Sequence, residues 1–328
     1  MLRFFRGTGP GTILLAMVLA VVFWIKAFAG YRVPLQSDGN MMVLYQLLHD
    51  FAGSSYLAGA VLSLVVVIVT ATTLIAFNTS TFFIPERTFL PGVLYMVLVA
   101  AFPEYQALNA AIPASLLLVL AVIRIAGTYR KAGTAYNFFD AALLIGLGSL
   151  FYASLIWFGI LLFAGIQIFR TFNFREVLIS LLGLATPYVF LFGIFYVADF
   201  DINNLTRTIS GSLFDPAANA EWSRLEVITS VFSGISLIIA LGHLFSVYNT
   251  KKVKSRKVIS LLVWVFMVTV AVYLIIPSAG KELIFILAAP ASYFLSHYFI
   301  FMKRKRVIPE IIFSGTIILV LLNLFLDI

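Results

Sequence analysis

Residues 138–170 read FFDAALLIGLGSLFYASLIWFGILLFAGIQIFR, a nearly unbroken apolar run of 33 residues. A helix needs about 20 apolar residues to cross a hydrocarbon core of ~30 Å. The run is too long for one crossing, so it predicts two short helices that meet in a tight turn near Ser154. The number of crossings favours this interpretation. A single crossing here would move Arg170, Arg175 and the later basic clusters to the opposite side of the membrane.

The rest of the chain repeats this pattern. Of its 328 residues, 62% are hydrophobic and only 11% are charged, and the charges collect between the apolar stretches. These stretches are too long and too uniformly apolar for barrel strands. The sequence therefore predicts an all-α, polytopic transmembrane bundle of about eleven spans, forming a single membrane domain over residues 1–328. The predicted spans lie near residues 12–30, 57–77, 88–103, 112–128, 138–153, 155–170, 177–198, 226–247, 258–277, 283–302 and 308–326.

Alternate connections between the spans differ in charge. One set holds 17 of the 22 lysines and arginines, including the basic loops 248–257 and 303–307. The other set holds most of the acids and the two longest outer loops, 31–56 and 199–225. The positive-inside rule then predicts a cytoplasmic N-terminus and an external C-terminus. The net charge of +8 is expected to face lipid headgroups rather than nucleic acid.

The first apolar segment resembles a secretory signal. Arg3 and Arg6 form a basic start, and Ala27-Phe28-Ala29 is similar to a cleavage site. Lys26 directly precedes that site and many spans follow, so we expect an uncleaved first span in the bacterial inner membrane. A cleaved signal is the alternative.

Several kinds of chemistry have no support in the sequence. Cysteine is absent, which excludes disulfides and thiolate metal sites. No nucleotide-binding motif occurs. We therefore predict no cofactor and no metal, with membrane lipids and other membrane proteins as partners.

The first outer loop is the strongest functional candidate. Asp38 precedes a predicted amphipathic helix over residues 39–51, whose polar face carries Gln46, His49 and Asp50 at i, i+3 and i+4 spacing. We expect this helix to lie on the outer membrane surface, with its polar side toward a water-filled cavity. Asp38 or Asp50 could act as a general base, and His49 could bind substrate. The alternative is structural, because Asp is a preferred N-cap residue.

The other outer loops supply three more candidates. Glu104 follows a proline at a span end and could provide a second catalytic carboxylate. Arg32 and Arg207 could bind a phosphate or diphosphate, since the forked guanidinium suits that group. The alternative for all three is a solvated loop residue with surface ion pairs.

The chain also resembles known families. The segment Asn137–Phe195, with Gly146-Leu147-Gly148-Ser149-Leu150, Arg170–Glu176 and Gly183–Pro187, looks like an uncharacterised family of multi-span bacterial inner-membrane proteins. With Arg87–Pro103 added, it is similar to integral-membrane glycosyltransferases of the GT-C type. That resemblance implies a catalytic acid before an amphipathic helix, the place of Asp38, and a polyprenyl-phosphate-linked sugar as donor. The chain departs from these enzymes at Ile112-Pro113, where they often carry an acid.

These features predict a function at the outer membrane face. The protein is expected to act on a lipid-linked or amphiphilic substrate there, with glycosyl transfer from a polyprenyl-phosphate donor as the specific form. Two alternatives stay open: a non-enzymatic membrane subunit of a larger envelope complex, and a transporter or lipid flippase.

Overall fold

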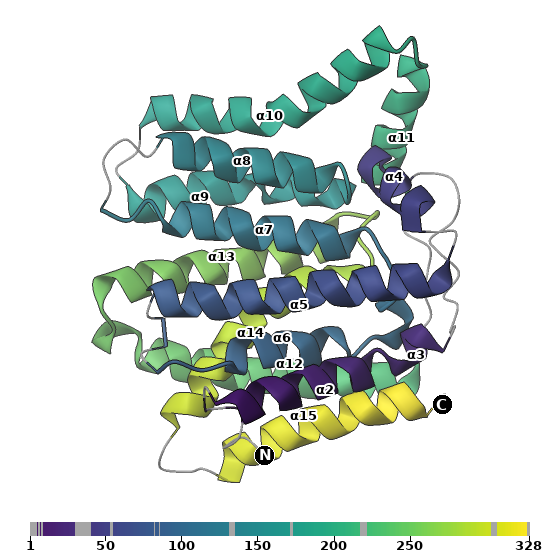
Figure 1. Cartoon of the computed structure of the whole chain (residues 1–328). Helices are drawn as coiled ribbons and strands as arrows, with labels where there is room; N and C mark the ends of the chain where they lie inside the picture. Colours follow the sequence, from purple (N-terminus) through teal and green to yellow (C-terminus); the bar gives the residue numbers. More distant parts are fainter. Residues whose placement is uncertain are drawn as a thin grey trace.

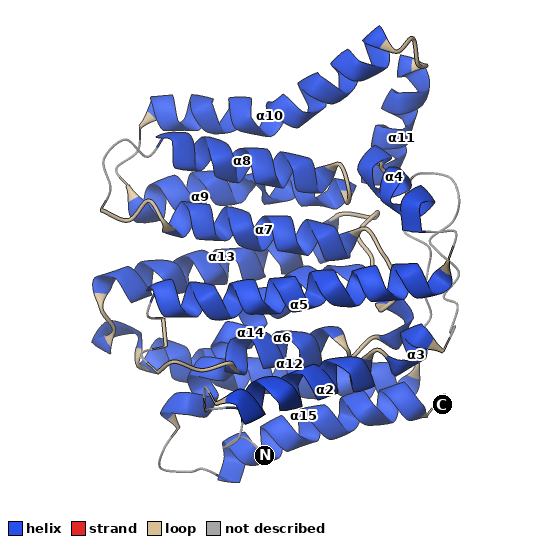
Figure 2. Cartoon of the chain, viewed as in Figure 1, coloured by secondary structure: helices blue, strands red, loops and turns tan. Residues whose placement is uncertain are grey.

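The computed structural model describes residues 5, 7, 9–29, 41–52, 55–81, 83–84, 86–130, 135–170, 173–216, 222–302 and 307–326. Over these residues the chain is helical and contains no strand (Figure 2). The α-helices are α2 (Pro10–Phe23), α3 (Ile25–Phe28), α4 (Val43–Ala52), α5 (Tyr56–Thr81), α6 (Leu90–Val99), α7 (Ala111–Ala126), α8 (Ala135–Ser149), α9 (Ile160–Phe169), α10 (Phe174–Val197), α11 (Ile202–Phe214), α12 (Arg224–Ser246), α13 (Val253–Ile275), α14 (Ile284–Phe301) and α15 (Val307–Phe325). The described 3-10 helices are η1 (Pro103–Tyr105), η2 (Ala153–Gly159), η3 (Tyr248–Thr250) and η4 (Lys281–Leu283).

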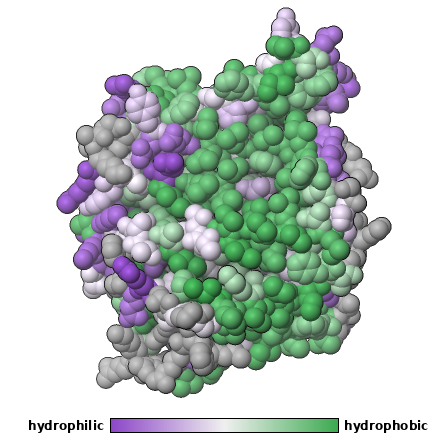
Figure 3. Space-filling model, viewed as in Figure 1, coloured by the Kyte–Doolittle hydropathy of each residue, from purple (hydrophilic) through white to green (hydrophobic). Residues whose placement is uncertain are grey.

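The long helices lie side by side, with their connections at two ends (Figure 1). Six of them are long and apolar enough to cross a membrane: α5, α10, α12, α13, α14 with η4, and α15. Shorter apolar helices fill the bundle between them. A broad hydrophobic band separates hydrophilic ends on the face shown in Figure 3. This architecture agrees with a helical membrane bundle.

The apolar run 138–170 forms two helical segments, as predicted. α8 ends at Ser149, and the chain turns back over residues 150–152 into η2 and α9. The turn is closed by backbone bonds from Leu150 N to Leu147 O (3.1 Å) and from Tyr152 N to Gly148 O (2.9 Å). The break therefore falls just before Ser154.

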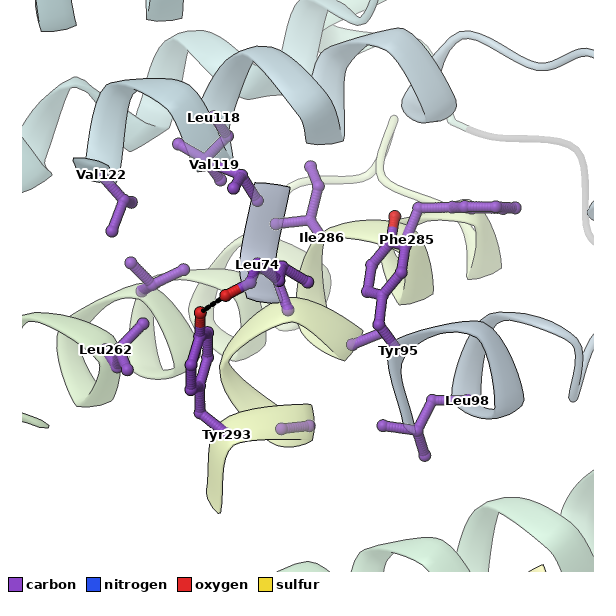
Figure 4. Packing of buried hydrophobic residues seen from close by; sticks show 14 of the residues in the cluster. Leu74, Tyr95, Leu98, Leu118, Val119, Val122, Leu262, Phe285, Ile286 and Tyr293 are labelled. Atoms are coloured by element: carbon purple, nitrogen blue, oxygen red, sulfur yellow. Dashed lines mark hydrogen bonds between the residues drawn. The ribbon is translucent and has the colours of Figure 1, made fainter. Parts of the chain in front are cut away.

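α14 is the most deeply buried of the six candidate spans. With η4, it has 89% of its most apolar window buried, against 28–44% in the other five. Its Tyr293 donates a hydrogen bond to the Leu74 carbonyl on α5. Tyr95 on α6 and Ser115 on α7 share another, 3.2 Å long. Figure 4 shows both tyrosines among the packed side chains of the core, which surrounds α14.

α8 and α10 approach each other closely because glycines lie between them. A Cβ at Gly146 would lie 2.8 Å from the Leu184 carbonyl oxygen, and one at Gly183 would lie 2.7 Å from the Phe139 carbonyl oxygen. Small residues of this kind let helix backbones pack closely in membranes. Beyond the contact, α10 contains Pro187 and bends away from α8 (Figure 1), as expected where proline removes a helical hydrogen bond.

Both of the long loops that were predicted to be outer, 31–56 and 199–225, contain a helix. The amphipathic helix predicted over 39–51 is observed as α4, in which Tyr45 is buried and Phe51 is exposed. α11 was not predicted. Asp201 caps it by accepting hydrogen bonds from the backbone of Asn203 (2.8 Å) and Asn204 (3.3 Å), which is a favourable N-cap arrangement.

Contacts between distant segments define two ends of the bundle. At the first, Ser278 bonds Ser154 (3.2 Å) and the Leu213 carbonyl (2.9 Å). We call it the acid-bearing end; it comprises residues 103–109, 150–154, 198–216, 222–226 and 276–282. At the opposite end Lys254 donates to the Ser80 carbonyl (3.1 Å). We call it the basic end; it comprises residues 86–89, 127–130 and 247–257.

The glycine contact predicts a position-dependent effect on stability. Gly183→Val should destabilise the protein by about 1–3 kcal/mol, the usual range for overpacking, because the new side chain meets backbone atoms of α8. Gly193→Val is the matched control on the same helix, since a Cβ there meets nothing within 4 Å. Thermal unfolding in detergent measures both. An equal melting temperature for the two variants would contradict the close contact.

Candidate functional site

The acid-bearing end is organised by the first turn of α12. Ser223 and Glu226 form a capping box: the Glu226 N–H donates to Ser223 Oγ (3.1 Å), and the Ser223 N–H donates to Glu226 Oε2 (3.2 Å). Such a box satisfies two backbone donors that a helix start leaves open. It also fixes the position of the Glu226 carboxylate, which is buried.

Lys281 completes a buried ion pair with that carboxylate. Its Nζ lies 2.9 Å from Glu226 Oε2, and the Lys281 and Glu226 side chains are only 4% and 2% exposed. The ammonium also lies 4.7 Å from the centre of the Trp222 ring, within range of a cation–π interaction. A buried pair of this kind is poor evidence for stability, because desolvation offsets much of the attraction. A role at a site is the alternative explanation.

Two further acids lie close to this pair. Glu104 is half-buried in η1; burial and then Glu226 raise the pKa of its carboxyl, while Lys281 and Lys26 oppose the rise. Glu282 is buried beside Lys281, and its carboxylate lies against Gly280. The acid-bearing end thus concentrates both charge signs in a partly desolvated space.

Glu282 also connects this cluster to α4, in the loop that was predicted to be the first outer one. Burial raises the pKa of Tyr45 on α4 to about 12, and the negative charge of Glu282 adds to the effect. Tyr45 is held in place by a hydrogen bond from its hydroxyl to the Leu108 carbonyl (3.0 Å). The structure therefore brings α4 and the segment 280–282 to the same part of the molecule.

An apolar cavity lies beside the ion pair. Its volume is about 250 Å³, and α6, α12, α13 and α14 form its walls. Trp222 and Lys281 line its charged end, whereas Leu237, Ala291 and Leu295 line it farther along the helices. The combination of a charged end and an apolar interior suits a molecule that is itself amphiphilic.

The predicted site residues are only partly brought together. Glu104 lies near the Glu226–Lys281 pair, as its pKa shift indicates. His49 and Asp50 are neighbours on α4, with Nδ1 and Oδ1 3.8 Å apart. Arg207 is exposed on α11, and no ion pair of it occurs among the described residues. The predicted Asp38 and Arg32 lie outside the described residues.

Sequence reasoning missed Glu226, Lys281 and Glu282 as site residues. The Ser-x-x-Glu spacing at 223–226 is a capping-box signal, and it could have located the Glu226 carboxylate. Lys281 and Glu282 form a charged dipeptide between two apolar spans. Nothing in the linear sequence indicates that they meet Glu226, 55 positions away.

Six helices long and apolar enough to span a membrane indicate a helical membrane protein. The chain belongs to a family of unknown function (DUF6427), whose family model matches residues 40–328. This agrees with the expected resemblance to an uncharacterised family, whereas a resemblance to GT-C enzymes is not found. No curated protein and no solved structure matches the chain.

The raised pKa of Glu104 predicts how the effect of replacing this residue on stability changes with pH. Because this pKa is raised above the ordinary 4.5, the folded state binds more protons than the unfolded state just above pH 4.5. The contribution of Glu104 to the free energy of unfolding therefore falls as the pH rises above 4.5. Glu104→Gln should gain melting temperature relative to wild type as the pH rises above 4.5, as measured by thermal unfolding in detergent. A gain that shrinks with rising pH would contradict the assignment.

Proposed function

We propose that this protein binds an amphiphilic, lipid-linked molecule at the acid-bearing end of its bundle and acts on it there. The observation that carries the proposal is the buried Glu226–Lys281 pair, whose Lys281 lines one end of a largely apolar cavity. A hydrocarbon chain fits the apolar walls, and a polar or charged headgroup fits the ionic end. The half-buried Glu104 adds a titratable carboxyl beside the headgroup position.

The proposal places the acid-bearing end outside the cytoplasm of a bacterial cell. The chain would cross the inner membrane eleven times, with its N-terminus inside and its C-terminus outside. The support is the charge distribution: 17 of 22 basic residues fall in one set of connections, and lysine and arginine favour the cytoplasmic side.

Cysteine labelling tests this orientation, because the chain has no cysteine of its own. Asn203→Cys on α11 and Asn249→Cys in η3 both replace exposed asparagines, at the acid-bearing and basic ends. A membrane-impermeant maleimide should label the first in intact spheroplasts and the second only after lysis. The reverse pattern would overturn the orientation.

Amphiphile binding predicts that a specific lipid accompanies the purified protein. Wild type is extracted in polymer-bounded membrane discs, and its lipids are compared with those of the bulk membrane by mass spectrometry. One amphiphile should be enriched, and Lys281→Met should lose most of that enrichment because its cation is gone. Lys252→Met, an exposed position at the basic end, is the control. Equal enrichment in all three proteins would contradict the role of the cavity.

Glycosyl transfer is the specific reaction that we propose for this site. Asp38 would take the proton of an acceptor hydroxyl while that oxygen bonds to the sugar C1. The bond from C1 to the lipid phosphate would break, and the phosphate would leave with the electron pair, held by Arg32 or Arg207. Asp50 is the second candidate for the base and Glu104 the third, with His49 beside the acceptor. The support is the predicted order of an acid and an amphipathic helix in the first outer loop, whose helix is observed as α4.

The lipid analysis extends to this reaction. A strain that carries Asp38→Asn in place of wild type should accumulate the lipid-linked sugar donor, as a deletion strain should. Asp50→Asn and Arg207→Met strains test the other assignments in the same extract. Unchanged lipid-linked sugars in the deletion strain would exclude sugar transfer and leave amphiphile binding in place.

A further inference from the structure

The cavity is a cleft between two helices. α12 and α13 both pack on α14 but make few contacts with each other, so α14 forms the floor of the space between them. Tyr273 and Leu274 of α13 line the cavity, yet they are 42% and 75% exposed. The cleft therefore reaches the apolar flank of the bundle, where exposed residues such as Val231 and Ile235 of α12 face outward. In a membrane that flank meets lipid and not water.

The length of the cleft corresponds to the hydrocarbon thickness of one lipid leaflet. Its lining extends along α14 from Ile284 to Leu295, which is about 16 Å at 1.5 Å per residue. Half of a ~30 Å hydrocarbon core has nearly the same length. The volume of about 250 Å³ exceeds the ~150 Å³ of an engineered apolar cavity that holds benzene. A section of one hydrocarbon chain therefore fits.

Two hydroxyl groups lie between the ionic end and the apolar interior. Thr229 and Ser230 line the cavity three and four residues beyond Glu226, so all three follow one side of α12. Thr229 Oγ1 and Ser230 Oγ are buried, and neither has a hydrogen-bond partner among the described residues. A buried hydroxyl without a partner is costly. A ligand oxygen at this depth would satisfy both.

We infer that the cleft between α12 and α13 binds one acyl chain of a bilayer glycerophospholipid, which enters sideways from the membrane. The order of groups along the cleft matches that ligand: Lys281 meets the phosphate, the Thr229 and Ser230 hydroxyls meet the ester oxygens, and the leucines near Leu295 surround the chain. This inference rests on the proposed amphiphile binding and specifies its ligand class; it does not depend on the proposed sugar transfer.

Filling the cleft is the direct test. Gly234 lines it, and a Cβ at Gly234 meets no atom within 4 Å. Gly234→Leu should therefore occupy the space without disturbing the helix, where leucine is favoured over glycine. Gly242→Leu is the matched control on the same helix, because it also meets open space but does not line the cavity.

The probe is a phosphatidylglycerol with a diazirine near the end of one acyl chain, supplied in vesicles that contain the full chain. After illumination, cross-links on wild type should map near Leu237 and Leu295. Gly234→Leu should lower their yield roughly tenfold, the ratio that corresponds to about 1.4 kcal/mol, and Gly242→Leu should leave it unchanged. Cross-links confined to the outer surface of α12, or an equal yield in both variants, would overturn the inference.

A second pair of variants tests the hydroxyl groups. Thr229→Val with Ser230→Ala should reduce labelling by the ester-linked probe but not by a diazirine alkane without ester oxygens. Equal effects on the two probes would remove the ester contact from the inference. If Lys281→Met abolishes lipid enrichment while Gly234→Leu is cross-linked as strongly as wild type, the acyl-chain site is wrong and the proposed amphiphile binding stands. If no variant changes the lipid enrichment or the cross-linking yield, the acyl-chain site and the proposed amphiphile binding are both wrong.

Discussion

Backbone N–H and C=O groups have no water to bond within hydrocarbon, so every one of them must find a partner inside the protein. The described part of the chain meets this constraint with helices alone. Several buried side-chain hydroxyls follow the same principle: Thr70, Ser180 and Thr269 each donate to a carbonyl one turn earlier on their own helix. Polar chemistry is therefore confined to the places where helices begin, end or separate.

The separation of α12 and α13 is such a place. α14 is buried along most of its length, so its neighbours must share its surface. α12 and α13 both use that surface and leave a space between themselves. On the other side of the bundle, glycines such as Gly146 and Gly183 close the corresponding spaces by letting backbones touch. The cavity thus reflects the space that α12 and α13 leave over α14, and its polar end reflects the capping of α12.

The loop that contains α4 and the cluster around the Glu226–Lys281 pair differ in how far the sequence could predict them. The amphipathic pattern of the first outer loop predicted α4, because helical periodicity is a local property. Glu104 was predicted at a span end from its proline and its flanking apolar run. The Glu226–Lys281 pair could not be predicted, because its members belong to segments whose approach depends on how α12 packs against α14. α11 was missed because its apolar positions, Leu205, Ile209 and Leu213, stand among asparagines and threonines that suggest a loop.

The sequence by itself determined that the chain is helical, where most helices begin and end, and how its charges divide between the connections. These properties follow from the length of apolar runs and from the cost of charge in hydrocarbon, which act on each segment separately. Only the tertiary structure decided which helices meet α14, which carboxylate pairs with Lys281 and where an empty space remains. Those outcomes depend on side-chain shapes packed against one another across many positions of sequence, and lipid-like composition gives almost no signal of them.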